Sequence, residues 1–579
     1  MSRNKPPSEL SEAMAALKPY FKQAALFSLF ASLLVLAPSG YMLEVYDRVV
    51  NSRSHMTLAM LTVLVLFAYV VMEVLEWVRS EVMHEASMAF DKRMSGRIFA
   101  AIFEANLKRL SGGTAQPMND FRTVRDFLHA PVLLALMEAP VSLVFLVLIF
   151  MISPVLGWSA VVAAIVQTFV GWLNERSTQA PLLAANRSAI AAQQYADGTL
   201  RNAQVIESMG MLRDIHGRWV DKQREFLGLQ ATASDHAGFY QAISKFLQNL
   251  VSSMLLGLGA WLLLRNELNG GAAYMIVGSI LGGRVLAPLI QIVAQWQAVI
   301  NVRDAYSRLE HLLAQVPKRP EGMPLPAPQG HLLVEGLVAG APGASAPILK
   351  GVSFALQPGE VLAVVGPSAS GKTTLARMLV GLWPAVNGKV RLDGADVHTW
   401  DKNELGPHMG YLPQGVELFD GSVAENIARF GEIDQAKVEA AARSVGLHEF
   451  ILALPKGYDN PVGQEGAMLS GGQRQRVGLA RAIYGNPAFV VLDEPNSSLD
   501  EQGDAALASA IAQLKSRGTT FVVMTHRTSV LGVADKMLVL RDGQTQMFGP
   551  RDEVLKALND AANQARQPAA PAAAAPAAA

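Results

Sequence analysis

Six long apolar runs before residue 300 restrict the fold more strongly than any other feature of the sequence. Each run is close to the ~20 residues that an α-helix needs to cross about 30 Å of hydrocarbon. One such run would also suit a buried helix of a soluble protein, but six together favour a membrane domain. The expected spans are residues 21–43, 56–78, 131–152, 155–173, 246–264 and 272–296, with Ser153 and Pro154 forming a tight hairpin between the third and the fourth.

The composition agrees with a membrane domain joined to a second domain. The chain has 579 residues, more than one hydrophobic core usually organises. Only 17% of them are charged, whereas a soluble domain has about 25%. The formal net charge of zero gives no reason to expect nucleic acid as a partner. Because the chain has no cysteine, disulfides, cysteine-based metal sites and thiol nucleophiles are excluded.

Basic residues indicate which loops face the cytoplasm. Lys and Arg are frequent between spans two and three and between spans four and five. The opposite connections carry only Arg48, Arg53 and Arg265. Since cytoplasmic loops carry the excess of Lys and Arg, we expect both long loops and both termini on the cytoplasmic side.

Ionisable residues inside a membrane span are costly and usually face the bundle interior or a wet cavity. Glu73, Glu138 and Arg284 lie inside the expected spans and are candidates for such positions. Arg284 follows the small residues at 278–282, whose spacing allows close helix approach, and Pro288 is able to kink the same helix. Two interpretations remain open. Either these charges line a translocation path, or an Arg–Glu pair fixes the helix packing.

A glycine-bounded loop in the second half has the context of a phosphate-binding loop, or P-loop. The apolar run at 361–365 predicts a buried strand before it, and 374–380 predicts a helix after it. In such a loop, backbone N–H groups and the helix N-terminus hold phosphate oxygens. Lys372 is expected to reach the β- and γ-phosphates, and the Thr373 hydroxyl to bind Mg²⁺. The residues of this loop expected to bind ATP are Gly366, Pro367, Ser368, Ala369, Ser370, Gly371, Lys372, Thr373 and Thr374.

Three later stretches supply further parts of an ATPase. Residues 489–494 predict a buried strand ending in two acids, with Asp493 placed to hold Mg²⁺ and Glu494 to orient or deprotonate the attacking water. Residues 521–525 predict another strand, which ends on His526. The third stretch, called the signature below, consists of Leu469, Ser470, Gly471, Gly472 and Gln473.

The signature, in this order and spacing, resembles that of the ATP-binding cassette (ABC) ATPases. RecA-like ATPases share the P-loop and the acidic strand but lack it. Together with residues 41–54, 202–211 and 282–288, the ATPase motifs resemble the ABC transporters of type I secretion systems, of the protease and lipase export kind. The resemblance implies a multi-domain fold: a six-helix α-helical transmembrane domain of the ABC exporter type, followed by an α/β P-loop ABC ATPase domain.

The resemblance also implies roles for single residues. Gln414 is similar to the Q-loop glutamine, which contacts ATP and joins Thr373 and Asp493 around Mg²⁺. The signature is expected to act in trans, on ATP held by a second copy of the chain. The implied catalytic residues are Glu494 and His526, and the implied D-loop acid is Asp500.

Short segments of the family are recognisable as well. Residues 462–466 resemble the exporter X-loop, while 114–125 and 202–211 are expected to form transverse helices that dock on the ATPase. One stretch departs from the family pattern: 337–343 contains no aromatic residue to stack on adenine. This places adenine stacking, and a strict preference for ATP over GTP, in doubt.

The expected domain organisation follows from composition and motifs. About twenty residues precede the first span, which leaves no room for an N-terminal peptidase domain. The expected parts are a cytoplasmic segment (1–20), the transmembrane domain (21–310), a Pro-rich linker (311–330), the ABC nucleotide-binding domain (331–560) and a disordered Ala/Pro tail (561–579).

The implied function is ATP-driven export of a protein across the inner membrane by a homodimer of half-transporters. The implied cofactors are ATP and Mg²⁺. The implied partners are a membrane-fusion (periplasmic adaptor) protein, an outer-membrane channel protein, a secreted protein substrate with a C-terminal signal, and the lipid bilayer. One alternative is an ABC exporter of a lipid, drug or peptide. Another is a membrane-tethered ABC regulatory protein without transport, which the intact Glu494, His526 and signature disfavour.

Overall fold

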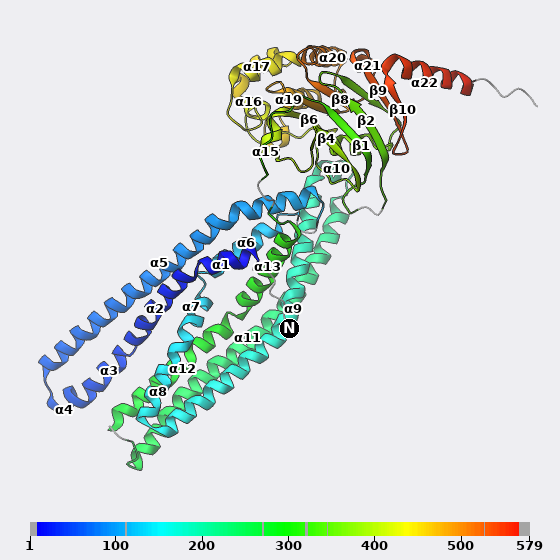
Figure 1. Cartoon of the computed structure of the whole chain (residues 1–579). Coiled ribbons are helices and arrows are strands. Elements are labelled where there is room, and N and C mark those ends of the chain that lie inside the picture. The colour runs from blue at the N-terminus through cyan, green and yellow to red at the C-terminus, as the bar shows by residue number, and fades with distance from the viewer. Residues whose placement is uncertain are drawn as a thin grey trace, which may run out of the picture. The chain divides into compact units, whose positions relative to one another are not determined.

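The computed structural model describes residues 8–110, 113–268, 271–318, 322–343, 346–525 and 527–566. Contacts between residues divide the chain into a helical unit (residues 1–106 and 110–318) and an α/β unit (residues 319–579, with which residues 107–109 are grouped). Figure 1 shows both units, and each is described by itself below.

The helical unit contains six helical segments that are long and apolar enough to cross a membrane: Lys18–Ser52, His55–Leu107, Pro131–Ile152, Pro154–Arg201, Leu212–Leu264 and Gly271–Ala294. Each contains or nearly coincides with one of the six expected spans, so the six-span prediction is confirmed for the described residues. The elements are α1 (Glu9–Ala16), α2 (Lys18–Leu34), α3 (Ala37–Glu44), the π-helix η1 (Val45–Val49), α4 (Val50–Ser52), α5 (His55–Leu107), α6 (Gln116–Phe127), α7 (Pro131–Glu138), η2 (Ala139–Val141), α8 (Ser142–Ile152), α9 (Pro154–Arg201), α10 (Ala203–Ser208), α11 (Leu212–Leu264), α12 (Gly271–Ala294) and α13 (Trp296–Gln315).

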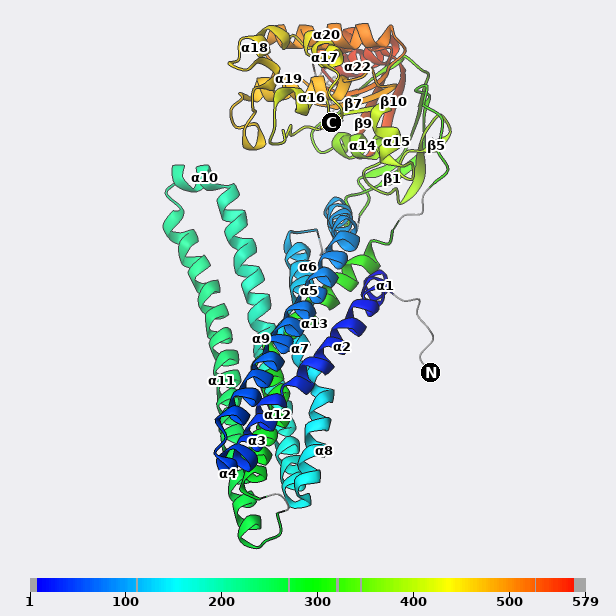
Figure 2. The ribbon, with the colours of Figure 1, turned by 90° about the vertical axis from the view of Figure 1, so that its left-hand side faces the viewer.

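Three of these helices are much longer than a membrane is thick. At 1.5 Å per residue, the 53 residues of α5 or α11 extend about 80 Å. Short helices connect to the ends of these long helices. The helix α10 joins the C-terminus of α9 to the N-terminus of α11, as Figure 2 shows, and α6 follows the C-terminus of α5. The expectation of short helices near 114–125 and 202–211 is therefore confirmed, while their docking on the ATPase stays a prediction.

Small residues let α12 approach its neighbours closely. A Cβ atom added at Gly282 would lie 2.0 Å from Cδ1 of Leu255 in α11, and one at Gly278 would lie 3.4 Å from Cδ1 of Leu156 in α9. The spacing at 278–282 thus has the close-packing role expected of it. Pro288 lies buried within α12, and the helix continues past it to Ala294.

The α/β unit contains two sheets. The smaller is antiparallel, with strand order β2-β1-β4-β5, and the larger has the order β10-β9-β3-β8-β7-β6 with parallel pairing from β9 to β6. The strands are β1 (Leu332–Ala339), β2 (Leu349–Leu356), β3 (Val361–Val365), β4 (Asn387–Leu392), β5 (Ala395–Asp396), β6 (Met409–Leu412), β7 (Phe489–Asp493), β8 (Thr520–Met524), β9 (Lys536–Arg541) and β10 (Gln544–Pro550).

Helices accompany the strands of this unit. They are α14 (Lys372–Leu379), α15 (Lys402–Leu405), η3 (Gly406–His408), α16 (Val423–Ile427), α17 (Gln435–Ser444), α18 (His448–Leu452), η4 (Gly457–Asp459), η5 (Gln464–Gly466), α19 (Gly471–Ile483), α20 (Glu501–Lys515), α21 (Thr528–Val533) and α22 (Arg551–Arg566).

The central strands of the larger sheet are buried on both faces. Successive side chains of a strand point to opposite sides, so Val361 and Ala363 of β3 pack in one core while Leu362 and Val364 pack in the other. Such strands are continuous apolar runs in the sequence, which explains why they were recognisable there. The carboxyl ends of parallel strands meet at one edge, the usual place for a ligand in an open α/β sheet.

Candidate functional site

The P-loop connects β3 to α14 and can exist only with glycine at its ends. A Cβ atom at Gly366 would lie 2.1 Å from the carbonyl oxygen of Leu540, and Gly371 has a φ of 103°. Nζ of Lys372 donates hydrogen bonds to the carbonyl oxygens of Gly366 (2.7 Å) and Pro367 (3.0 Å). The ammonium group therefore lies over the loop, where phosphate oxygens would replace these carbonyl contacts.

Asp493 ends β7 with a carboxylate that is only 1% exposed. Neither of its oxygens has a hydrogen-bond partner among the described residues, and the same holds for the buried hydroxyl of Ser370 in the P-loop. Burial raises the pKa of Asp493, and the charge of Glu494 adds to that rise; the nearby Thr373 hydroxyl opposes it, although it makes no hydrogen bond of normal geometry to the carboxylate. A buried carboxylate without a partner is costly unless it meets a cation. Asp493 beside Thr373 thus fits Mg²⁺ that carries phosphate.

Glu494 follows directly and has a different environment. Its backbone is left-handed, with a φ of 52°, and its N–H donates to the carbonyl oxygen of Met524 at 3.0 Å. Its carboxylate oxygen Oε2 accepts a hydrogen bond of 3.1 Å from Nε2 of Gln414, which follows β6. The structure thus brings together two predicted site residues that are 80 positions apart in the chain.

The signature forms the start of α19. Ser470 is the N-cap residue: its Oγ accepts from the N–H of Gln473 at 3.3 Å, and Oε1 of Gln473 accepts from the N–H of Ser470 at 2.8 Å. This reciprocal capping box orders the first turn. The N-terminus of a 13-residue helix has free N–H groups and a partial positive charge, which suits a phosphate group. His526 lies outside the described residues.

Comparisons with known proteins agree with both halves. Residues 23–284 match the ABC transporter transmembrane region, and residues 349–497 match the ABC transporter family. The type I secretion system ATP-binding protein PrsD of Rhizobium meliloti (strain 1021) is 40% identical over 530 residues, which cover 91% of each chain. The chain is an ABC transporter of the type I secretion family.

More distant proteins are similar over most of this ABC transporter as well. The toxin RTX-I translocation ATP-binding protein of Actinobacillus pleuropneumoniae is 27% identical, covering 94% of this chain and 77% of that protein. The solved structure of a bacterial Atm1-family ABC exporter with ATP bound has a TM-score of 0.83 at 22% identity, covering 97% of this chain and 100% of that chain. At that identity, the likeness supports the fold alone.

Two residues beyond the signature contact segments of the candidate site and were missed by sequence reasoning. Gln475 and Arg476 lie one turn into α19, and both contact the segment that follows Glu494. Arg476 forms an ion pair of 2.6 Å with Asp500, the N-cap residue of α20. The available signal was their helical spacing from the signature glycines, but the sequence does not show what such a helix face contacts.

The three residues predicted to line a translocation path have different surroundings. Glu138 forms an ion pair of 2.5 Å with Arg79, which is only 7% exposed and also reaches the hydroxyl of Ser28 at 3.4 Å. This contact joins three helices and favours the packing interpretation for Glu138. Its partner was missed because Arg79 lies just past the expected end of span two. Glu73 and Arg284 are exposed in the single chain, and their place on a translocation path stays a prediction.

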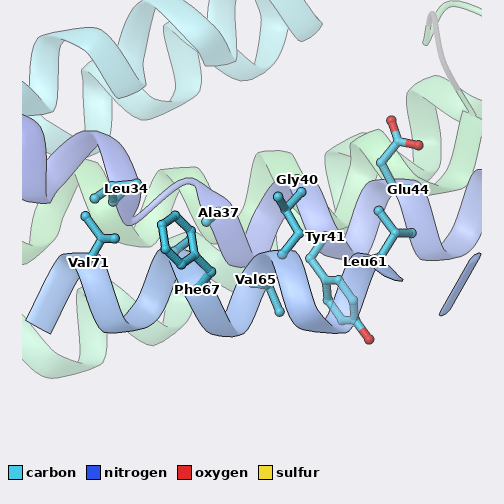
Figure 3. Close-up of a pocket in the computed structure, with 11 residues that line it drawn as sticks. Leu34, Ala37, Gly40, Tyr41, Glu44, Leu61, Val65, Phe67 and Val71 are labelled. Carbon is cyan, nitrogen blue, oxygen red and sulfur yellow. The ribbon is translucent and has the colours of Figure 1, made fainter. Parts of the chain in front are cut away.

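An apolar cavity of about 350 Å³ lies between α5 and the segment made of the end of α2 and α3. Figure 3 shows the side chains that line it, with Leu34 from α2, Ala37 from α3 and Phe67 from α5. Polar groups come from Tyr41, whose hydroxyl is 3.1 Å from that of Thr62, and from Glu44. None of the three predicted path residues lines this cavity.

Proposed function

We propose that this chain is half of a homodimeric exporter that uses ATP hydrolysis to move a protein out of the cytoplasm. The observation that carries the proposal is the 40% identity, over almost the whole chain, to a type I secretion system ATP-binding protein. The distant relative named for toxin translocation supports the same class of cargo.

In the proposed ATP site, the P-loop N–H groups and Lys372 bind the phosphates. Thr373, Gln414 and Asp493 would hold Mg²⁺, which neutralises charge on the β- and γ-phosphates. Glu494 orients or deprotonates the attacking water. Its hydrogen bond with Gln414 keeps the carboxylate next to the metal ligands.

We further propose that His526 contacts the γ-phosphate, and that the signature of one chain completes the site of its partner. Ser470, Gly471 and Gly472 of one copy would then meet the γ-phosphate held by Lys372 of the other. A chain with a single cassette can build two such sites by symmetric dimerisation. Asp500, next to the signature helix, would lie near the same interface.

The proposed setting is the inner membrane, with both termini and the ATPase on the cytoplasmic side. We propose, on the family resemblance, a periplasmic adaptor protein and an outer-membrane channel as partners. The proposed substrates carry an uncleaved C-terminal signal. The basic residues of the long loops support this orientation, since they exceed those of the short opposite connections.

The test compares proteins secreted into the medium by cells that carry the wild-type chain or Glu494→Gln. We expect one or more proteins to disappear from the medium and to accumulate in the cells that carry the variant. A tagged wild-type chain should co-purify with an adaptor protein. An unchanged set of secreted proteins, together with altered lipid or drug export, would replace this proposal with the alternative exporter class.

A further inference from the structure

We propose that Gln475 couples the two ATP sites of the dimer by tying Glu494, which serves one site, to the signature helix, which serves the other. The inference rests on the shared-site dimer proposed above. It assigns a positioning role to a residue that takes no part in binding ATP itself.

Gln475 is buried, with 3% of its surface exposed, and uses both ends of its amide. Nε2 donates to the carbonyl oxygen of Glu494 at 3.2 Å and to Oγ of Ser497 at 3.1 Å. Oε1 accepts from the N–H of Ser498 at 2.7 Å. A primary amide satisfies two acceptors and one donor here, which neither a carboxylate nor an aliphatic side chain can do.

Two other contacts join the signature helix α19 to the segment 494–500, which begins with Glu494. Gly472 lies so close that an added Cβ would be 2.9 Å from the carbonyl oxygen of Ser498. Arg476 pairs with Asp500, but the Asp500 side chain is 65% exposed, and exposed ion pairs are weak constraints. The buried amide of Gln475 is therefore the main link between α19 and the backbone of Glu494.

The link matters because it acts on a strained residue. Glu494 has a left-handed backbone, a conformation that persists only where the surroundings hold it. Gln475 and the N–H of Ser497 hold its carbonyl group, Met524 holds its N–H, and Gln414 contacts its carboxylate. A shift of the first turns of α19 would therefore move the peptide group of Glu494 and change the direction of its carboxylate.

The signature and Glu494 of one chain serve different ATP sites of the proposed dimer. The signature of a chain faces the ATP held by its partner, whereas Glu494 acts on the ATP held by its own P-loop. When ATP engages the signature at one site, the resulting position of α19 is passed through Gln475 to the catalytic base of the other site.

The first test uses the full-length homodimer with Gln475→Glu. The introduced carboxylate is not larger than the amide, but it cannot donate to the carbonyl of Glu494. We expect kcat for ATP to fall at least about tenfold, since misplacing a catalytic group can cost about a hundredfold. ATP binding, measured with a fluorescent ATP analogue, should stay within about twofold because the P-loop is untouched.

Gln513→Glu is the matched control, because Gln513 is an exposed glutamine on α20 of the same unit. It should leave both kcat and binding unchanged. If Gln475→Glu does not accumulate, Gln475→Met, which removes the donors without adding charge, is measured in its place. A normal kcat in the tested variant overturns the proposal, and so does a loss of ATP binding equal to the loss of kcat.

Hybrid dimers test the two-site link. With Ser470→Arg in one chain, the single intact site uses that chain's Glu494 and the other chain's signature. Gln475→Glu is then added to the first chain, where it acts on the base, or to the second, where it acts on the signature. We expect both placements to lower the remaining activity, and Gln513→Glu in either chain to leave it unchanged.

The proposed link is overturned if Gln475→Glu lowers ATPase activity in only one of the two chains, or in neither. If the Ser470→Arg hybrid binds ATP but is inactive, the intact site depends on the other site. The proposal is then judged by the kcat and ATP binding of the Gln475→Glu homodimer, with the outcomes given above. These assays measure ATP turnover and ATP binding, not export. A dimer that hydrolyses ATP and exports no protein would refute the proposed function without affecting this test.

Discussion

Asp493 and Glu494 are adjacent acids that their surroundings prepare for different tasks. Asp493 is almost fully buried, and burial raises its pKa, so a cation is needed to keep its charge favourable. Glu494 is half-buried and hydrogen-bonded to Gln414. Its left-handed backbone costs about 1–2 kcal/mol. A proposed cation site next to a strained, oriented carboxylate is an arrangement suited to phosphoryl transfer to water.

Two substitutions separate ATP binding from hydrolysis. Glu494→Gln keeps the shape and the hydrogen bond but loses the base, so hydrolysis should fall by about a hundredfold or more while ATP stays bound. Lys372→Ala should instead weaken ATP binding. Steady-state hydrolysis and binding of a fluorescent ATP analogue measure both. A Glu494→Gln variant with half of normal turnover would show that another group activates the water.

Because residues 337–343 contain no aromatic residue, we predict that the ATPase discriminates only weakly between adenine and guanine nucleotides. Losing a stacking contact of ~1 kcal/mol leaves less than about a tenfold preference. ATP and GTP should therefore support hydrolysis with kcat/KM values within about tenfold of each other. A preference of a hundredfold or more for ATP would show that another group reads adenine.

At the scale of elements, small residues and ion pairs hold helices of the helical unit close together. Gly282 lets α12 lie against α11, and Arg79 joins α5 to α7 and α2. The guanidinium charge of a buried Arg is tolerated there only because Glu138 pairs with it. The same pair explains why Glu138 has a polar partner inside a largely apolar bundle.

Replacing one partner of the Arg79–Glu138 ion pair should lower the free energy of unfolding more than replacing both partners. Glu138→Leu leaves Arg79 buried without its partner and should cost about 3 kcal/mol of the free energy of unfolding. Arg79→Leu combined with Glu138→Leu should recover most of that loss, as measured by unfolding in detergent. Arg284→Ala is the control: it should keep stability and basal ATPase activity but reduce secretion. Additive losses in the double variant would contradict a direct pair.

At the scale of the whole molecule, the chain has two units that depend on a membrane in different ways. The helical unit exposes large apolar side chains such as Phe67, Trp77 and Ile165, which need hydrocarbon around them. The α/β unit buries its apolar runs within its own sheets. Only the first unit therefore requires a bilayer to be stable.

The orientation of the helical unit can be tested with single cysteines, because the chain has none of its own. Asn51→Cys, beside α5, should react with an impermeant maleimide added outside the inner membrane. Gly228→Cys, within the long part of α11, should react only after the membrane is opened. Labelling of Asn51→Cys from the cytoplasmic side alone would contradict the six-span orientation.

The shared site predicts complementation between two inactive chains. A dimer of one Lys372→Ala chain and one Ser470→Arg chain collects both lesions in one site and none in the other. Partial ATPase activity, up to about half if the sites act independently, should return on mixing. Hydrolysis at the normal rate by an isolated monomeric cassette would refute the shared site.

Local patterns in the sequence were sufficient for much of this protein. Burial in hydrocarbon or between two layers leaves continuous apolar runs, so the six spans and the strands β3, β7 and β8 could be read directly. The P-loop and the signature were equally clear, because glycines are required where a Cβ atom would collide, as at Gly366 and Gly472.

Only the tertiary structure decided which side chains meet. Glu494 lies 80 residues from Gln414 and 19 from Gln475, and Arg79 lies 59 from Glu138. Each contact depends on how strands order in a sheet or how helices turn against each other, and no local pattern encodes these. Gln475 looks like one more polar residue of an amphipathic helix. Its proposed role rests on the fold, which brings its amide against the backbone that carries Glu494.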